Sequence, residues 1–249
     1  KKINNVTLKN EARAYTYLKS LHCIPKIKSF GVDGKYNFLV IDLLDKSLFD
    51  LVKENGKLKL EQVLKIGEKI INIIREIHET GIIHRDVKPE NFMFKNDELK
   101  AIDFGLSKKY IRDNKHIELE SNKSIVGTPY FISTHIHAGL TPSRRDDIES
   151  IGYILLYLLF GTLPWLNLTS ENKELRNHKV YEIKKCDPFV LFKGAPKELK
   201  IFIRYCRSLK FTEKPNYLYL TNLLQMLAKS NLSHSDNVCS EILYLNHLK

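Results

Sequence analysis

Two short polar motifs, separated by two short apolar runs, constrain this chain more than any other feature. The first is His84-Arg-Asp-Val-Lys-Pro-Glu-Asn91, and the second is Asp103-Phe-Gly105, which begins twelve residues after the first ends. The runs Phe92-Met-Phe and Leu99-Lys-Ala-Ile lie on either side of Asn96-Asp97, an arrangement typical of a β-hairpin. Either motif alone occurs by chance in many chains. The two in this order, with a hairpin between them, indicate a functional site.

The residue types in these motifs suit phosphoryl transfer, which needs few groups but needs them at fixed mutual distances. Asp86 is predicted to accept the proton of an attacking hydroxyl, and Lys88 to lie beside the transferring phosphoryl. Asn91 is predicted to reach a Mg²⁺ ion. Asp103 follows the second strand directly, so it is expected to point out of the strand end toward the same metal.

The first part of the chain predicts one helix and an antiparallel pair of strands. Apolar residues recur at helical spacing over residues 8–21, which predicts a short helix carrying Glu11. Residues 26–30 and 36–43 are rich in apolar and aromatic residues, and the segment Gly31-Val-Asp-Gly-Lys35 between them has turn chemistry. Residues 1–42 are therefore expected to form a small strand-containing lobe.

The rest of the chain is mainly helical in its pattern. Apolar residues every three or four positions over 60–79 predict a long amphipathic helix, and further helices are expected at 145–160, 196–208 and 217–228. A crossing segment at 42–47 links the two parts. We therefore predict an α+β, bilobal fold, with an incomplete small lobe at 1–42 and a hinge and large helical lobe at 43–249.

Composition restricts the partners more than the chemistry. The formal net charge of +11 over 249 residues favours anionic partners, although a solvated lysine-rich surface explains it equally well, and nucleic-acid binding could coexist with catalysis. The four cysteines are far apart, and His135 and His137 have no further ligand nearby in sequence, so no metal site is predicted from them. The most apolar run, 151–160, is too short to span a membrane.

Both motifs resemble those of protein kinases, and the resemblance continues through most of the chain. Gly127-Thr128 matches the activation segment, and Asp147 matches the residue that supports the catalytic loop in that family. Within the kinases, the chain resembles the casein kinase I group, although the usual Ala-Pro-Glu is absent and Ser133-Thr-His135 stands where casein kinase I has Ser-Ile-Asn. Vaccinia-related kinases also depart from Ala-Pro-Glu at this point and are the nearest competitor. The segments that carry this likeness are 43–51, Ser143-Arg-Arg-Asp-Asp-Ile-Glu-Ser150 and 206–217. The abundant lysine, asparagine and isoleucine would suit a viral or parasite member.

The resemblance also assigns the nucleotide site. It implies that Lys1, in preference to Lys2, is the strand lysine that contacts the α- and β-phosphates, paired with Glu11. Ile41 would be the gatekeeper behind adenine, and the backbone of Asp42 and Leu44 would hydrogen-bond the base. The family's Gly-rich loop precedes the strand lysine, so the sequence is expected to be part of a longer protein; the alternative is a protein that works without that loop.

The implied activity is that of a serine/threonine protein kinase using ATP with Mg²⁺, or Mn²⁺ in its place. Arg144, Lys184 and Lys185 match the family positions that bind an acidic or phosphorylated residue upstream of the acceptor, although a surface ion pair is an equal alternative for the arginine. A pseudokinase scaffold and a small-molecule phosphotransferase are the rival interpretations. A monomer is expected in the cytoplasm or nucleus, or, for a viral protein, in the host cytoplasm or the virion.

Overall fold

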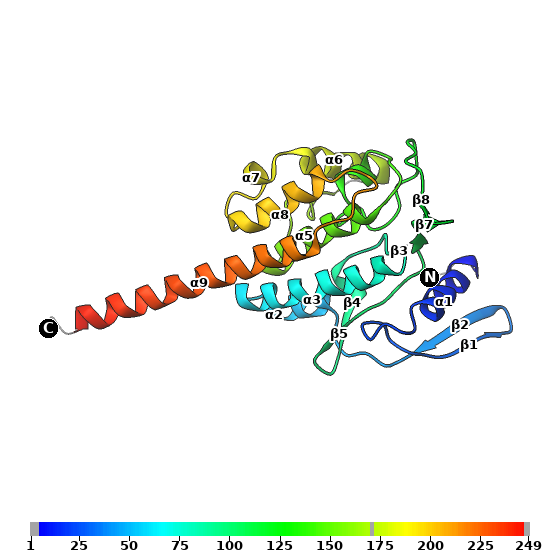
Figure 1. The fold of residues 1–249 in the computed structure, drawn as a ribbon, viewed down its shortest axis with the longest axis horizontal. Helices are drawn as coiled ribbons and strands as arrows, with labels where there is room; N and C mark the ends of the chain where they lie inside the picture. Colours follow the sequence, from blue (N-terminus) through cyan, green and yellow to red (C-terminus); the bar gives the residue numbers. More distant parts are fainter. Residues whose placement is uncertain (1–4, 170–171, 247–249) are drawn as a thin grey trace.

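The computed structural model describes residues 5–169 and 172–246, in which a small strand-containing part lies beside a larger helical part (Figure 1). The small part holds α1 (Asn5–Tyr17) and the antiparallel strands β1 (Ile27–Asp33) and β2 (Tyr36–Ile41). Residues 42–46 have no regular secondary structure and cross to the helical part. The predicted α+β arrangement of a small strand-containing lobe and a larger helical lobe is confirmed.

The predicted turn between the first two strands was too long. Gly31 lies within β1 and pairs with Phe38, whose ring lies so close that a Cβ on Gly31 would meet it at 2.7 Å. The glycine is therefore required by close packing, and the turn consists of Gly34 and Lys35 alone. Gly34 has a φ of +54°, a left-handed conformation that glycine adopts without a steric cost.

The helical part is built on α3 (Leu60–Glu79), whose apolar face is buried as its periodicity predicts. It packs against α5 (Arg144–Phe160), which is buried on nearly all sides, and against α9 (Tyr217–Asn246). Gly67 permits the close approach, since a Cβ there would lie 2.7 Å from Leu155 and 2.8 Å from Leu224. The remaining helices are α2 (Leu48–Asn55), α4 (Thr134–His137), α6 (Lys173–Lys185), α7 (Pro188–Leu191) and α8 (Lys197–Ser208).

Short strands line the junction between the two parts. The predicted hairpin is present as β4 (Phe92–Lys95) and β5 (Glu98–Ala101), joined at Asn96, which has a φ of +53°. A single 3-10 turn, η1 (Pro89–Asn91), precedes it, and β3 (Ile82–Ile83) pairs with β6 (Lys108–Lys109). A second small hairpin, β7 (Ile111–Arg112) and β8 (Lys115–His116), follows.

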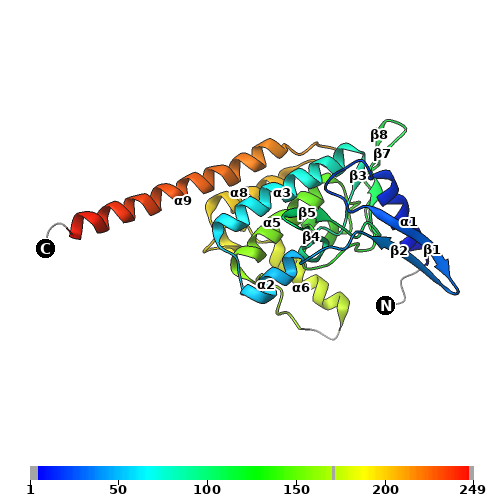
Figure 2. The same cartoon turned by 90° about the horizontal axis from the view of Figure 1, so that it is seen from below.

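Figure 2 shows α9 running along α3 and then continuing beyond the other helices. The sequence pattern predicted this helix to end at residue 228, whereas it ends at Asn246. No helix in the described ranges has the length and hydrophobicity that a membrane span needs.

Candidate active site

The side chain of Asp86 lies at the centre of a compact set of hydrogen bonds. One carboxylate oxygen accepts from both the backbone N–H and the hydroxyl of Thr128, each at 2.8 Å. The other lies 2.7 Å from Nζ of Lys88, which also donates to the Thr128 hydroxyl at 3.1 Å. Asn91 donates its side-chain N–H to the Asp86 carbonyl at 2.8 Å. Asp86 is therefore fixed in orientation by its own loop and by the segment that carries Thr128.

A buried carboxylate binds the backbone just before Asp86. Asp147, near the start of α5, accepts from the backbone N–H groups of His84 at 2.7 Å and Arg85 at 2.9 Å. It also accepts from His78 at 2.9 Å. Burial opposes its ionisation, yet these hydrogen bonds hold the pKa of Asp147 below its usual value. The ionised carboxylate therefore supports the left-handed Arg85, which has a φ of +68°.

Contacts among three rings hold the Asp103-Phe-Gly105 turn in place. The ring of Phe104 lies between Tyr15 of α1, with centroids 5.2 Å apart, and His84, with centroids 4.9 Å apart. The Tyr15 hydroxyl accepts the backbone N–H of Asp103 at 3.2 Å. Asp103 itself is exposed and has a φ of +62°, so packing on its neighbour maintains a backbone conformation that aspartate seldom adopts.

Glu11 of α1 lies close enough to Asp103 for the two carboxylates to repel each other. Burial, and then the charge of Asp103, raise the pKa of Glu11 to about 7, although a hydrogen bond from the Phe104 backbone lowers it. In the described ranges no lysine or arginine forms an ion pair with Glu11. The predicted partner, Lys1, lies outside the described residues, so its pairing stays a prediction.

Asn91 and Asp103 are the candidate metal ligands. Asn91 uses its amide nitrogen on Asp86, and no hydrogen bond within the described residues uses its amide oxygen. An amide oxygen and a carboxylate are hard ligands of the kind that Mg²⁺ takes together with substrate phosphates. The donor set therefore fits the predicted ion. Among the residues described, no group of three or more His, Cys, Asp and Glu side chains lies close enough together to hold a metal ion.

The segment between the two lobes contains the predicted adenine contacts. Ile41 ends β2 and is partly buried, as is Leu44, whereas Leu43 between them is 92% exposed. The backbone N–H of Asp42 donates to Lys26 at 3.0 Å. This N–H is therefore already used within the fold, and the hydrogen bonds to a base predicted for the backbone of Asp42 and Leu44 stay predictions.

A family model for the protein kinase domain matches residues 1–227. The chain belongs to the protein kinase family. The match covers both motifs, the hairpin between them and the helices that support them. The predicted kinase fold and general kinase function are therefore confirmed, and the residue roles can be argued from the geometry above.

The end of the kinase activation segment is anchored by side chains that the sequence did not reveal. The Ser133 hydroxyl donates to Asp146 at 2.5 Å, and Thr134 donates its backbone N–H to Glu149 at 3.2 Å. Glu149 is fully buried and also accepts from Arg207 of α8 at 3.2 Å. Asp146 and Glu149 are three residues apart, so they share one face of α5. Only the fold shows that the segment at 133–134 lies against that face.

One of the three residues predicted to bind a substrate anion has a structural role instead. Lys184 is fully buried, donates to the carbonyls of Pro129 at 3.0 Å and Ile132 at 2.7 Å, and lies over the rings of two aromatic residues. Burial holds its pKa well below the usual value. The prediction for Lys184 is therefore wrong. Arg144 donates to the Thr212 carbonyl and packs on a tyrosine ring, while its Nε has no hydrogen-bond partner among the described residues, so its anion-binding role stays a prediction. Lys185 is exposed and pairs with Glu182.

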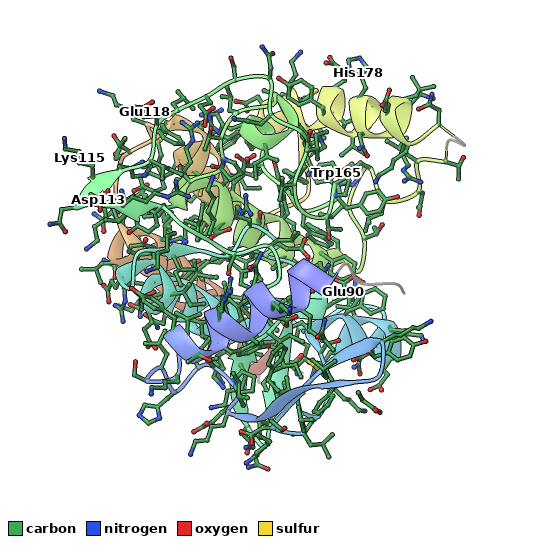
Figure 3. The ribbon with its side chains drawn as sticks, turned by 90° about the vertical axis from the view of Figure 1, so that its right-hand side faces the viewer. Glu90, Asp113, Lys115, Glu118, Trp165 and His178 are labelled. Carbon is green, nitrogen blue, oxygen red and sulfur yellow. The ribbon has the colours of Figure 1, made fainter. Side chains whose placement is uncertain are left out.

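A different basic cluster, which the sequence analysis missed, lies beside the catalytic loop. Burial, followed by the charges of Arg85 and Arg112, lowers the pKa of Lys108, and Lys123 contributes in the same direction. The other three cations therefore lie close enough to Lys108 to repel it, whereas Glu120 attracts it and forms an ion pair with Lys123. In Figure 3, Asp113 and Lys115 at the tip of the β7–β8 hairpin lie at the outer edge of the molecule.

Replacing Gly127 with alanine is expected to lower kcat about 100-fold, because small displacements of a catalytic group can cost this much. Gly127 has a φ of +96°, and a Cβ there would lie 2.5 Å from the Arg85 carbonyl. The clash must push Thr128 away from Asp86. Gly34→Ala is the matched control, since that glycine also has a positive φ but has no atom within 4 Å of its Cβ position. Equal kinase rates for the two variants would contradict this prediction.

Proposed function

We propose that this protein is a serine/threonine protein kinase that transfers the γ-phosphoryl group of Mg·ATP to a protein hydroxyl. The observation that carries the proposal is the triangle formed by Asp86, Lys88 and Thr128. An acceptor hydroxyl that displaces the Thr128 hydroxyl contact would meet a carboxylate and an ammonium held 2.7 Å apart. A lysine at this place resembles serine/threonine kinases more than tyrosine kinases.

In this mechanism each residue has one task. Asp86 orients the acceptor hydroxyl and takes its proton, while Lys88 offsets the negative charge that develops on the transferring group. Asn91 and Asp103 would hold Mg²⁺, which neutralises charge on the bound phosphates. Glu11 would hold the strand lysine, and a cation there would relieve its repulsion with Asp103. No covalent intermediate on the protein is needed.

Casein kinase I-like specificity for acidic or pre-phosphorylated substrates is part of the proposal, with a corrected set of residues. Because Lys184 is buried, the cluster of Arg85, Lys108 and Lys123 is the better candidate for an upstream anion. Arg85 and Lys123 both repel Lys108, so an anion added beside Lys108 would be favoured by the electrostatics. Arginine and lysine together also suit phosphate oxygens.

A pseudokinase that acts as a binding scaffold is the alternative. The observation that favours it is the raised pKa of Glu11, which leaves the helical glutamate partly protonated at neutral pH unless a cation joins it. Against it stand Asp86, Lys88, Asn91 and Asp103, which are all present and close together.

The test is to incubate the protein with Mg²⁺ and ATP labelled on its γ-phosphate, using a casein-like acidic protein as acceptor. Label on phosphoserine or phosphothreonine supports the proposed activity, and label only on phosphotyrosine would overturn its specificity. ATP binding measured by calorimetry, without transfer to any acceptor and without autophosphorylation, would support the pseudokinase instead.

The charge reversals Lys108→Glu and Lys123→Glu, made together, are expected to raise KM for a phosphorylated peptide about tenfold. The kcat for an uncharged peptide should stay unchanged, because neither side chain contacts Asp86. Peptide kinetics with and without the upstream phosphate measure the effect. If the double variant loses activity equally on both peptides, the cluster has no part in choosing the substrate.

A further inference from the structure

A polar cavity of about 370 Å³ lies beside Asp42, away from the catalytic loop. Its walls come from the loop between α1 and β1, from the end of β2 and from the β4–β5 hairpin. Figure 1 shows that loop, drawn in dark blue, next to β5. The charged and ionisable side chains that line it are Lys19, His22, Lys26, Asp42, Lys95, Glu98 and Lys100.

Both carboxylates in this cavity are already neutralised. Asp42 contacts Nζ of Lys95 at 2.7 Å and Nζ of Lys28 at 2.9 Å, and these hydrogen bonds lower its pKa strongly. Glu98 contacts Nζ of Lys100 at 2.6 Å. Positive charge therefore remains in excess. The ammonium groups of two lining lysines, Lys19 and Lys26, have no ion pair or hydrogen bond within the described residues.

One lining residue of the cavity, Lys100, is mostly buried and is held by the fold. Its side chain is 10% exposed, and Nζ donates to the His22 carbonyl at 2.6 Å. The next residue, Ala101, donates its backbone N–H to the Cys23 carbonyl at 2.9 Å. These bonds tie the loop after α1 to β5, and Asp103 follows two residues later. Anything that fills the cavity therefore touches a strand that positions a candidate metal ligand.

We propose that this cavity binds the phosphate group of a phosphorylated protein segment. A phosphate monoester carries a charge of about −1.5 to −2 at neutral pH. It therefore matches the charge of two unpaired ammonium groups better than a carboxylate, which carries one charge. The site has no Phe, Tyr or Trp in its lining, so a nucleotide would find no ring on which to stack its base. A phosphorylated side chain needs no such ring.

A bound phosphate would join the two lobes at the hinge. Lys19 and Lys26 belong to the small lobe, whereas Lys95 and Lys100 belong to the hairpin of the large lobe. The phosphate would therefore act as a docking contact separate from both the acceptor site and the cluster around Lys108. Binding at this cavity does not require kinase activity, so it can be measured even if the proposed activity is absent.

The test measures binding of a fluorescein-labelled, glutamate-containing peptide with one phosphoserine, by fluorescence anisotropy. The full chain is used with a non-hydrolysable ATP analogue and Mg²⁺ present, so that the peptide cannot be held in the nucleotide site. The double variant Lys19→Glu/Lys26→Glu is expected to bind at least about tenfold more weakly than the wild type. Lys53→Glu/Lys57→Glu changes the net charge equally on the exposed surface around α2 and should leave the affinity unchanged.

Three outcomes would overturn the proposal. The first is equal binding of the phosphorylated and unphosphorylated peptides, and the second is an unchanged affinity in the Lys19→Glu/Lys26→Glu variant. The third is displacement of the peptide by inorganic phosphate at a concentration equal to that of the peptide, which would indicate a site for free anions. A Lys108→Glu/Lys123→Glu variant that keeps the phosphorylated peptide bound would support a site apart from the catalytic loop.

Discussion

The Asp86→Asn variant is expected to lose about a thousand-fold in kcat, within the range that a lost general base costs. An asparagine keeps the size of the side chain but cannot take a proton, and its N–H₂ group would face the Thr128 donors or the Lys88 ammonium. Phosphate transfer from labelled ATP measures the loss. ATP affinity should change little, because Asp86 acts on the acceptor hydroxyl.

The Asp103→Asn variant is expected to lose kinase activity because it binds the metal ion more weakly, which distinguishes the role of Asp103 from that of Asp86. Its loss should be partly reversed by raising Mg²⁺ or Mn²⁺, because a neutral amide is a weaker ligand that a higher metal concentration can saturate. No metal concentration should rescue Asp86→Asn. Asp113→Asn, at an exposed position with a φ of +49° that asparagine tolerates, is the matched control. Rescue of both variants by metal would contradict the assignment of Asp86.

The Asp147→Asn variant is expected to lower the free energy of unfolding by about 3 kcal/mol, the scale of leaving a buried donor or charge partner unsatisfied. Asp147 is 3% exposed and accepts three hydrogen bonds with two oxygens. An amide offers one oxygen, so at least one of His78, His84 and Arg85 must lose its acceptor. Urea unfolding followed by circular dichroism measures this change.

The catalytic loop should also be displaced in Asp147→Asn, so kinase activity should fall in the fraction that stays folded. Because its folded-state pKa lies below the ordinary 3.8, Asp147 stabilises the fold at neutral pH and loses this effect as the pH falls through the folded-state value. The gap between wild type and variant should therefore narrow in acid. Asp187→Asn, which removes an exposed pair with Arg204, is the control and should unfold at nearly the wild-type urea concentration. Equal urea midpoints for Asp147→Asn and the wild type would contradict the proposed support.

Local sequence patterns were sufficient to predict a helix or hairpin that buries a single apolar face. The periodicity of 60–79 predicted α3 to the residue, and the turn residues between 92 and 102 predicted the β4–β5 hairpin. The pattern failed at Gly31, because a glycine in a strand and a glycine in a turn look the same until the ring of Phe38 is placed over it. It also did not predict α6, whose surface is mostly polar and gives little periodic signal.

The sequence by itself determined the kinase family and indicated Asp86, Lys88, Asn91 and Asp103 as the candidate catalytic and metal-binding residues, because these residues are set by short spacings within one loop and one hairpin. Tertiary structure alone decided which charges are available to a ligand. Lys184 and Lys185 are adjacent in sequence, yet one is fully buried beneath backbone carbonyls and the other is exposed. The cluster around Lys108 and the cavity beside Asp42 each combine residues from separate segments. Burial and long-range proximity depend on how the helices pack, and no local spacing encodes them.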